Sequence, residues 1–209
     1  MNIWKRRPWA VACAALLAGC AAAPSAPPVL LSLPPAVTTN AALAEPAVSA
    51  SASASAAPQL LAIRRIGIPE YLVARRVRYR ADASTLAEWP NTFWAERIEI
   101  GVSREFVAAL RQQLPGWAVC ESNCGDLQPI VALQVEMVPM DFVRSTLRLQ
   151  ARARITLSGG ASARVLSTEE RVYDLPAAGD SPQSHAQAMT ELIRQIAQAV
   201  APLVQNARP

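Results

Sequence analysis

The sequence predicts an α/β (α+β) fold in which a mixed, largely antiparallel sheet carries two helices packed on one face. Two segments of alternating apolar and polar residues, at 130–140 and 147–157, indicate strands with one buried and one solvated face. Apolar residues at helical spacing over 96–114 and after Ser181 indicate two amphipathic helices. Packing both helices on the apolar face of the sheet is the simplest way to bury these surfaces.

The N-terminus has the three regions of a bacterial secretory signal. Basic residues at 5–7 precede an apolar run at 9–17, which is much shorter than the roughly 20 apolar residues that a transmembrane helix needs. The run leads into Leu17-Ala18-Gly19-Cys20, which resembles the bacterial lipobox. A cysteine that merely ends an ordinary signal peptide, or a chance match, is the alternative.

The lipobox resemblance implies that residues 1–19 are a lipoprotein signal peptide and that Cys20 becomes the new N-terminus. Cys20 would then carry a diacylglycerol and an N-acyl chain. Each buried methylene contributes about 0.8 kcal/mol, so two or three acyl chains anchor a protein stably where one does not. Ala21 replaces the Asp that tends to retain such lipoproteins at the inner membrane. The resemblance therefore implies the periplasmic face of the outer membrane of a Gram-negative bacterium.

Residues 20–58 are predicted to be the lipidated N-terminus and an Ala/Ser/Pro-rich tether. Such a composition buries too little apolar surface to offset its ordering entropy. A flexible chain of this length could span tens of ångströms. The apolar island VLLSLPP at 29–35 interrupts it, and residues 29–33 could form an edge strand docked on the domain or remain part of the tether.

The periplasmic domain is predicted over residues 59–209. In its first half, the helix expected over about 96–114 ends at Pro115 and Gly116, because proline has no N–H group to donate to the helical hydrogen bonds. Strands are expected at 60–66 and 76–81, with a short extended piece near 86–89, a helix over about 96–114 and a brief strand at 117–120.

The second half is predicted to be an antiparallel meander followed by a helix. The turn at 158–162 joins the strand at 147–157 to a third strand at 163–175. Ser181 is expected to cap the last helix, with Pro182 at its first position. We expect Pro202 to mark its end.

Charge and side-chain chemistry argue against nucleic-acid binding and catalysis. The signal segment holds three of the 20 basic residues and none of the 16 acidic ones, so the rest is almost balanced. The only histidine, His185, is expected to be solvated near the start of the last helix. We therefore expect no enzyme, no metal site and no cofactor beyond the acyl groups on Cys20. The acidic residues expected to pair with arginines, rather than to act as acid and base, are Asp126, Glu136, Asp141 and Glu169.

Cys120 and Cys124 are the cysteines that remain once Cys13 leaves with the signal and Cys20 takes lipid. Disulfides persist in the periplasm, so we expect a bridge between them that fixes the loop after the strand at 117–120. Two free thiols, or half of a metal site, are the alternatives.

Arginines gather in two places. Arginine binds phosphate bidentately, so these groups could form a surface for phospholipid head groups or an acidic partner. The other interpretation is a solvated sheet face on which arginines pair with cross-strand carboxylates such as Glu136, Glu169 and Glu170. One group is Arg64, Arg65, Arg75, Arg76, Arg78 and Arg80, and the other is Arg148, Arg152 and Arg154.

Two motifs, IPEYL at 68–72 and WAE at 94–96, lie in a segment that resembles the auxiliary lipoproteins of ABC-type lipid transport systems, the PqiC/YmbA-like family. The family's short strand after the lipobox matches VLLSL at 29–33, which favours the docked strand. The chain departs from the family's pattern at 73–77 and 97–98.

The resemblance implies a non-catalytic lipoprotein that serves a system in which an MCE-domain protein carries lipid between the two membranes. The protein would dock the outer-membrane end of that conduit, and a ring-like homo-oligomer would suit it. A structural or assembly lipoprotein, pilotin-like and unrelated to lipid transport, is the alternative. The candidate contacts for a partner or a lipid head group are Tyr71, Arg75, Arg76, Arg78 and Trp94.

Overall fold

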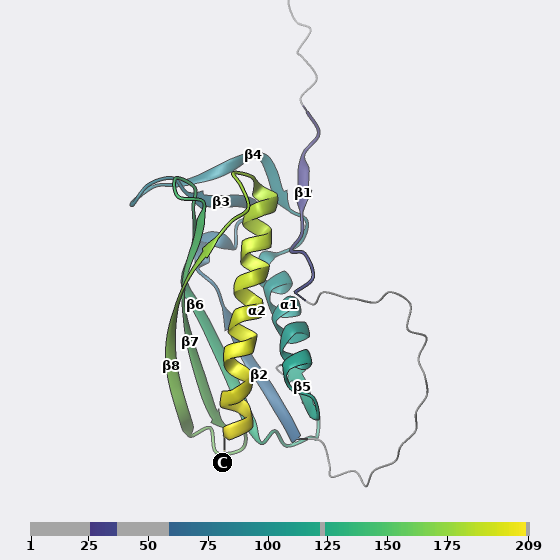
Figure 1. Ribbon diagram of the computed structural model, residues 1–209. Coiled ribbons are helices and arrows are strands. Elements are labelled where there is room, and N and C mark those ends of the chain that lie inside the picture. The colour runs from purple at the N-terminus through teal and green to yellow at the C-terminus, as the bar shows by residue number, and fades with distance from the viewer. Residues whose placement is uncertain (1–25, 37–58, 122–123, 208–209) are drawn as a thin grey trace, which may run out of the picture.

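The computed structural model describes residues 26–36, 59–121 and 124–207 (Figure 1). The predicted signal peptide, Cys20, and the predicted tether apart from residues 26–36 lie outside the described residues. Within the described residues, eight strands form one mixed sheet and two helices pack on one of its faces, which confirms the predicted fold class.

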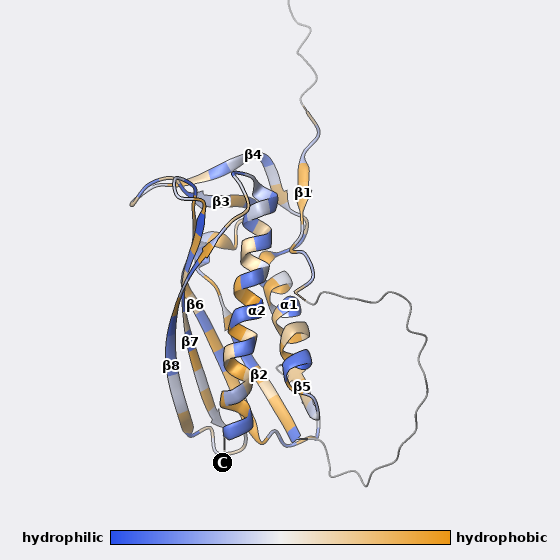
Figure 2. Cartoon of the chain, in the orientation of Figure 1, coloured by the Kyte–Doolittle hydropathy of each residue, from blue (hydrophilic) through white to orange (hydrophobic). Residues whose placement is uncertain are grey.

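One side of the sheet is the predicted antiparallel meander. It consists of β6 (Val131–Val143), β7 (Arg148–Gly159) and β8 (Val165–Pro176), and it ends at β8 as the edge strand. Along β6 and β7, buried residues alternate with exposed ones, and hydrophobic and hydrophilic residues alternate in colour in Figure 2. The alternating sequence therefore determines which face of the meander meets the helices.

Two arms extend from the other side of β6. One arm is β2 (Gln59–Gly67), which runs parallel to β6 and carries β5 (Trp117–Glu121) at the sheet edge. The other arm is β3 (Arg76–Arg80), which meets the end of β6 at a single parallel pair. These parallel pairings make the sheet mixed.

β4 (Leu86–Trp94) pairs antiparallel with β3 and is longer than the predicted extended piece near 86–89. Pro90 and Asn91 look like a turn in sequence, but the strand resumes after them, with φ at 48° for Asn91. Partners on both sides of residues 92–94 explain why the strand continues, because β3 and β1 flank it. A local turn signal is overridden here by pairing with distant segments.

The helices are α1 (Ile98–Gln113) and α2 (Pro182–Asn206), which lie side by side over the sheet (Figure 1). The Ser181 side chain accepts a hydrogen bond from the Ser184 amide at 3.1 Å, as predicted for the cap of α2. Phe106 and Leu110 of α1 and Ile196 of α2 are fully buried between the layers.

The prediction that Pro202 ends the last helix is wrong, because α2 continues to Asn206 with Pro202 inside it. A proline removes one backbone hydrogen bond but leaves φ compatible with a helix. Val204, two positions after Pro202, is completely buried. Its packing holds the last turn against the sheet.

The prediction that His185 is solvated is also wrong. His185 is 2% exposed and stacks on Phe142, with ring centroids 4.6 Å apart. Burial lowers the pKa of the imidazole to about 3. The position lies on the buried stripe of α2, four residues before Met189, so the apolar spacing of the helix already indicated an inward side chain.

Candidate functional site

The candidate contacts predicted from the sequence divide between core and surface. Trp94 is 4% exposed, so almost none of its surface is available to a partner or head group. Tyr71 and Arg78 are half-buried, whereas Arg75 and Arg76 are exposed. Of the five candidate contacts, only Arg75 and Arg76 are exposed to solvent.

Tyr71 belongs to a one-turn helix, η1 (Glu70–Leu72), that follows β2. Its hydroxyl donates to Asp141 of β6 at 2.8 Å, and Arg80 of β3 donates to both oxygens of the same carboxylate at 3.0 Å. Burial and the Asp141 carboxylate raise the pKa of Tyr71 to about 12. Tyr71 therefore joins the turn after β2 to the end of β6 rather than facing a ligand.

Arg78 is also engaged within the domain. One guanidinium nitrogen donates to the Tyr71 carbonyl at 3.0 Å, and its Nε lies 3.3 Å from Glu88 of β4. These contacts hold η1 and β4 to β3, so the side chain has a structural role.

Arg75 and Arg76 remain at the surface around one aromatic ring. Their guanidinium carbons lie 5.7 Å and 5.1 Å from the centroid of Phe93, within the range of cation–π attraction. Arg76 also pairs with Glu88 at 3.3 Å. Arg75 has no ion pair with any described residue.

The N-terminal segment 26–36 adds a strand beside this ring. β1 (Val29–Leu31) runs parallel to β4, with Leu30 opposite Phe93 and Leu31 opposite Trp94. Leu31 and Leu33 are 7% and 4% exposed and belong to the core. The island left open by the sequence thus lies on the domain as an edge strand.

Polar contacts hold the same segment at three places. The amide of Asn91 donates to the Ala26 carbonyl at 2.8 Å, and Thr190 of α2 donates to the Pro34 carbonyl at 3.1 Å. The Ala36 amide donates to the buried Glu105 carboxylate of α1 at 2.9 Å. The segment is therefore bound to β4, α1 and α2 together.

Sequence reasoning missed these anchoring residues. The sequence could have indicated Glu105, because it is a charged residue one position before Phe106 on the apolar side of α1. Nothing in the sequence indicates Asn91 or Thr190, because their partners are backbone carbonyls more than 60 positions away.

One row of side chains crosses the three strands at this corner of the sheet. The register places Leu30 beside Phe93 and Phe93 beside Arg76. Leu30 is 58% exposed. We call Leu30, Phe93, Arg75 and Arg76 the β1–β4–β3 patch; it combines exposed apolar surface with two guanidinium groups.

A pocket of about 260 Å³ adjoins the patch. It is formed where residues 73–75, which directly follow IPEYL, meet the WAE motif. Its lining residues are Val73, Ala74, Arg75, Trp94, Ala95, Glu96 and Arg97.

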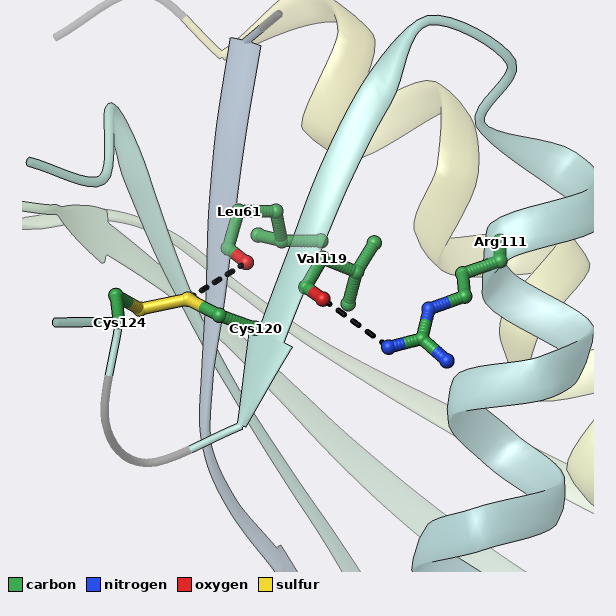
Figure 3. Close-up of a disulfide and its surroundings, with 5 residues drawn as sticks. All are labelled: Leu61, Arg111, Val119, Cys120 and Cys124. Atoms are coloured by element: carbon green, nitrogen blue, oxygen red, sulfur yellow. Dashed lines mark hydrogen bonds between the residues drawn. A yellow bond between two sulfur atoms is a disulfide. The ribbon is translucent and has the colours of Figure 1, made fainter. Parts of the chain in front are cut away.

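Cys120 and Cys124 form a disulfide at the end of β5, with Cα atoms 5.5 Å apart (Figure 3). The Cys120 sulfur lies 3.6 Å from the Leu61 carbonyl oxygen, a packing contact because a disulfide sulfur has no hydrogen to donate. Arg111 of α1 donates to the Val119 carbonyl at 3.2 Å. The bridge thus lies where the edge strand β5 is held between β2 and α1.

The arginines of the second group lie on the solvated face of β7, where two of them form ion pairs; the group is Arg148, Arg152 and Arg154. Arg154 lies 3.0 Å from Glu170 and 3.8 Å from Glu136, across both neighbouring strands. Arg148 pairs with Asp174 at 2.6 Å. Cross-strand pairing is therefore confirmed on β7, except at Arg152, which is exposed and has no ion pair with a described residue.

Across residues 26–36, 59–121 and 124–207, no group of His, Cys, Asp and Glu side chains could hold a metal ion. Neither of the two helices described is both long enough and apolar enough to cross a bilayer.

The sequence model of one family, described as ABC-type transport auxiliary lipoprotein component, matches residues 42–201. The intermembrane transport lipoprotein PqiC of Escherichia coli K12 is 29% identical over 83 residues, and that of Shigella flexneri matches equally. The matched stretch is 40% of this chain and 44% of each relative, so the chain spans less than half the length of the curated relatives it matches.

Two crystal structures share the fold. One, of an uncharacterized protein, has a TM-score of 0.66 at 16% identity and covers 86% of this chain and 99% of that one. The other, of a Xanthomonas campestris protein, has a TM-score of 0.57 at 15% identity and covers 71% and 84%. At these identities the likeness shows the fold alone.

Proposed function

The chain belongs to the family of ABC-type transport auxiliary lipoprotein components, and we propose that it is the membrane-anchored accessory subunit of an intermembrane lipid transport system. The observation that carries the proposal is the family match over residues 42–201. The name of the matched relative, an intermembrane transport lipoprotein, supports the lipid-transport setting.

In this proposal Cys20 carries the diacylglycerol and the N-acyl chain, and Ala21 directs the protein to the periplasmic face of the outer membrane. There it contacts an MCE-domain protein that carries lipid between the membranes. Its role is binding rather than catalysis, consistent with a family described as a transport auxiliary component. A homo-oligomer would allow several copies to surround the end of a conduit.

The partner can be tested by photocrosslinking in cell envelopes. Lys5 is the only lysine and lies in the predicted signal, so amine-reactive reagents would find no lysine on the mature chain. A photoreactive amino acid can instead replace exposed apolar residues on different parts of the surface. Suitable positions are Leu30, Leu127, Val138 and Val172.

We expect at least one of these positions to capture an MCE-domain protein, with the other positions serving as matched controls for proximity. Capture of only a secretin or an assembly porin would instead support an assembly lipoprotein and overturn the transport role.

A further inference from the structure

We propose that the β1–β4–β3 patch is a membrane-contact surface that binds the head groups of anionic phospholipids. The inference rests on the proposed function, because it requires acylation of Cys20. It goes further by stating which face of the domain lies on the bilayer.

The docked N-terminal segment limits how far the domain can move from its anchor. Ala26 follows Cys20 by six residues, and six residues span at most about 21 Å. From Ala26 onwards the chain is bound to Asn91, Thr190 and Glu105. The reach of the anchored protein is thus set by six residues rather than by the whole predicted tether.

The patch lies at the same end of the molecule as this attachment. β1 starts at the upper end in Figure 1, beside β4 and β3, whereas the turn after β7 lies at the lower end with the C-terminus. β7 has 12 residues and is about 40 Å long. A short connection therefore keeps the patch near the membrane and the β7–β8 turn far from it.

The chemistry of the patch suits a phospholipid interface. Guanidinium groups bind phosphate oxygens bidentately, and aromatic and aliphatic side chains enter the boundary between head groups and acyl chains. Arg75 has no ion pair with a described residue, and Arg76 shares Glu88 with Arg78. The patch thus carries a net positive charge next to the exposed side chain of Leu30.

Depth-dependent fluorescence quenching tests the geometry. The acylated full chain is placed in vesicles of phosphatidylcholine with phosphatidylglycerol and a lipid quencher near the head groups. A single added cysteine carries the dye, because Cys20 is acylated and Cys120 and Cys124 are bridged. Ala95→Cys places it beside the patch, and Ala161→Cys places it in the β7–β8 turn; both positions are exposed.

We expect strong quenching at position 95 and little at position 161. Arg75→Glu with Arg76→Glu should reduce quenching at position 95, because each arginine near an anionic surface favours the bound orientation by about fivefold. Replacement of both by lysine should preserve most of the quenching. The matched control is Arg152→Glu on β7, which removes an exposed arginine that has no ion pair with a described residue, and it should leave quenching unchanged.

Equal quenching at both positions, or indifference to the charge of residues 75 and 76, would overturn the inference. So would capture of an MCE-domain protein at Leu30 without lipid quenching at position 95, which would make the patch a protein interface. In those cases acylation and partner capture would persist, and the proposed function would stand. An unacylated chain would instead remove the proposed function itself.

Discussion

His185 is packed between Phe142 and Trp94, and its Nδ1 atom has no hydrogen-bond partner among the described residues. The folded state therefore favours the neutral imidazole, because burial lowers its pKa from the ordinary value of 6.5 to about 3. Because the folded pKa is the lower one, the stabilising contribution is complete above pH 6.5. This contribution is lost progressively as the pH falls from 6.5 towards 3, because the imidazole is then protonated in the unfolded chain but not in the folded one.

We predict that stability falls by about 1.4 kcal/mol per pH unit below pH 6.5 because of this one residue. Chemical denaturation between pH 7.5 and 5 measures the slope before most carboxylates titrate. His185→Phe keeps the ring packing and should flatten the slope in that range. A variant with the same slope as the natural chain would show that another group is responsible.

Glu105 binds the backbone of the N-terminal segment from the core. Its carboxylate accepts the Ala36 amide at 2.9 Å and the Arg104 guanidinium at 3.0 Å. Glu105→Ala should lower the free energy of unfolding by about 1–3 kcal/mol, because a buried amide loses its acceptor. Hydrogen exchange at Ala36 should accelerate as well.

The matched control is Gln112→Ala, an exposed position on the same helix, which should change stability by no more than about 0.5 kcal/mol. Unchanged exchange at Ala36 in the Glu105 variant would mean that apolar packing of Leu31 and Leu33 alone holds the segment.

At the scale of elements, the disulfide joins β5 to the chain that leads towards β6. It closes a loop with a sequence separation of only four. Chain entropy predicts a stabilisation of about 2 kcal/mol at most for so short a loop. Reductant should therefore lower stability by that amount or less without unfolding the domain.

Thiol counting on the purified protein provides the direct check of the bridge. No free thiol should appear without reductant and two should appear with it. Two free thiols before reduction would contradict the bridge.

At the scale of elements, the sequence also predicts some boundaries better than others. The cap of α2 was predictable because Ser181 and Pro182 act within one turn. The continuation of α2 past Pro202 and of β4 past Pro90 was not, because buried neighbours and flanking strands overcome a local break. Propensity is a weak guide wherever tertiary packing is strong.

For the whole molecule, the proposed anchor predicts a processing defect in Cys20→Ser. Without the thiol no diacylglycerol can be attached, so unprocessed precursor should accumulate and no acylated form should appear. Mass spectrometry and membrane fractionation measure both. A substituted protein that is still cut and still held in the membrane would contradict the anchor.

The proposed transport role predicts a phenotype at the same scale. Cells without the protein should be more sensitive to detergents, because lipid traffic between the membranes supports the outer membrane. Restoring the natural chain should reverse the defect, whereas the Cys20→Ser variant should not. Equal detergent sensitivity with and without the protein would weigh against the lipid-transport role.

The sequence by itself determined the helices, most of the strands and the family, because periodic burial, capping and short motifs act over a few residues. Only the tertiary structure decided which predicted contacts are free. Tyr71 meets Asp141 across 70 positions, and Trp94 is covered by the core. Arg75 and Arg76 are exposed at Phe93, and Leu30 lies on the other side of Phe93 because β1 packs next to β4. Burial and ion pairing depend on partners that are distant along the chain, and only folding brings them together.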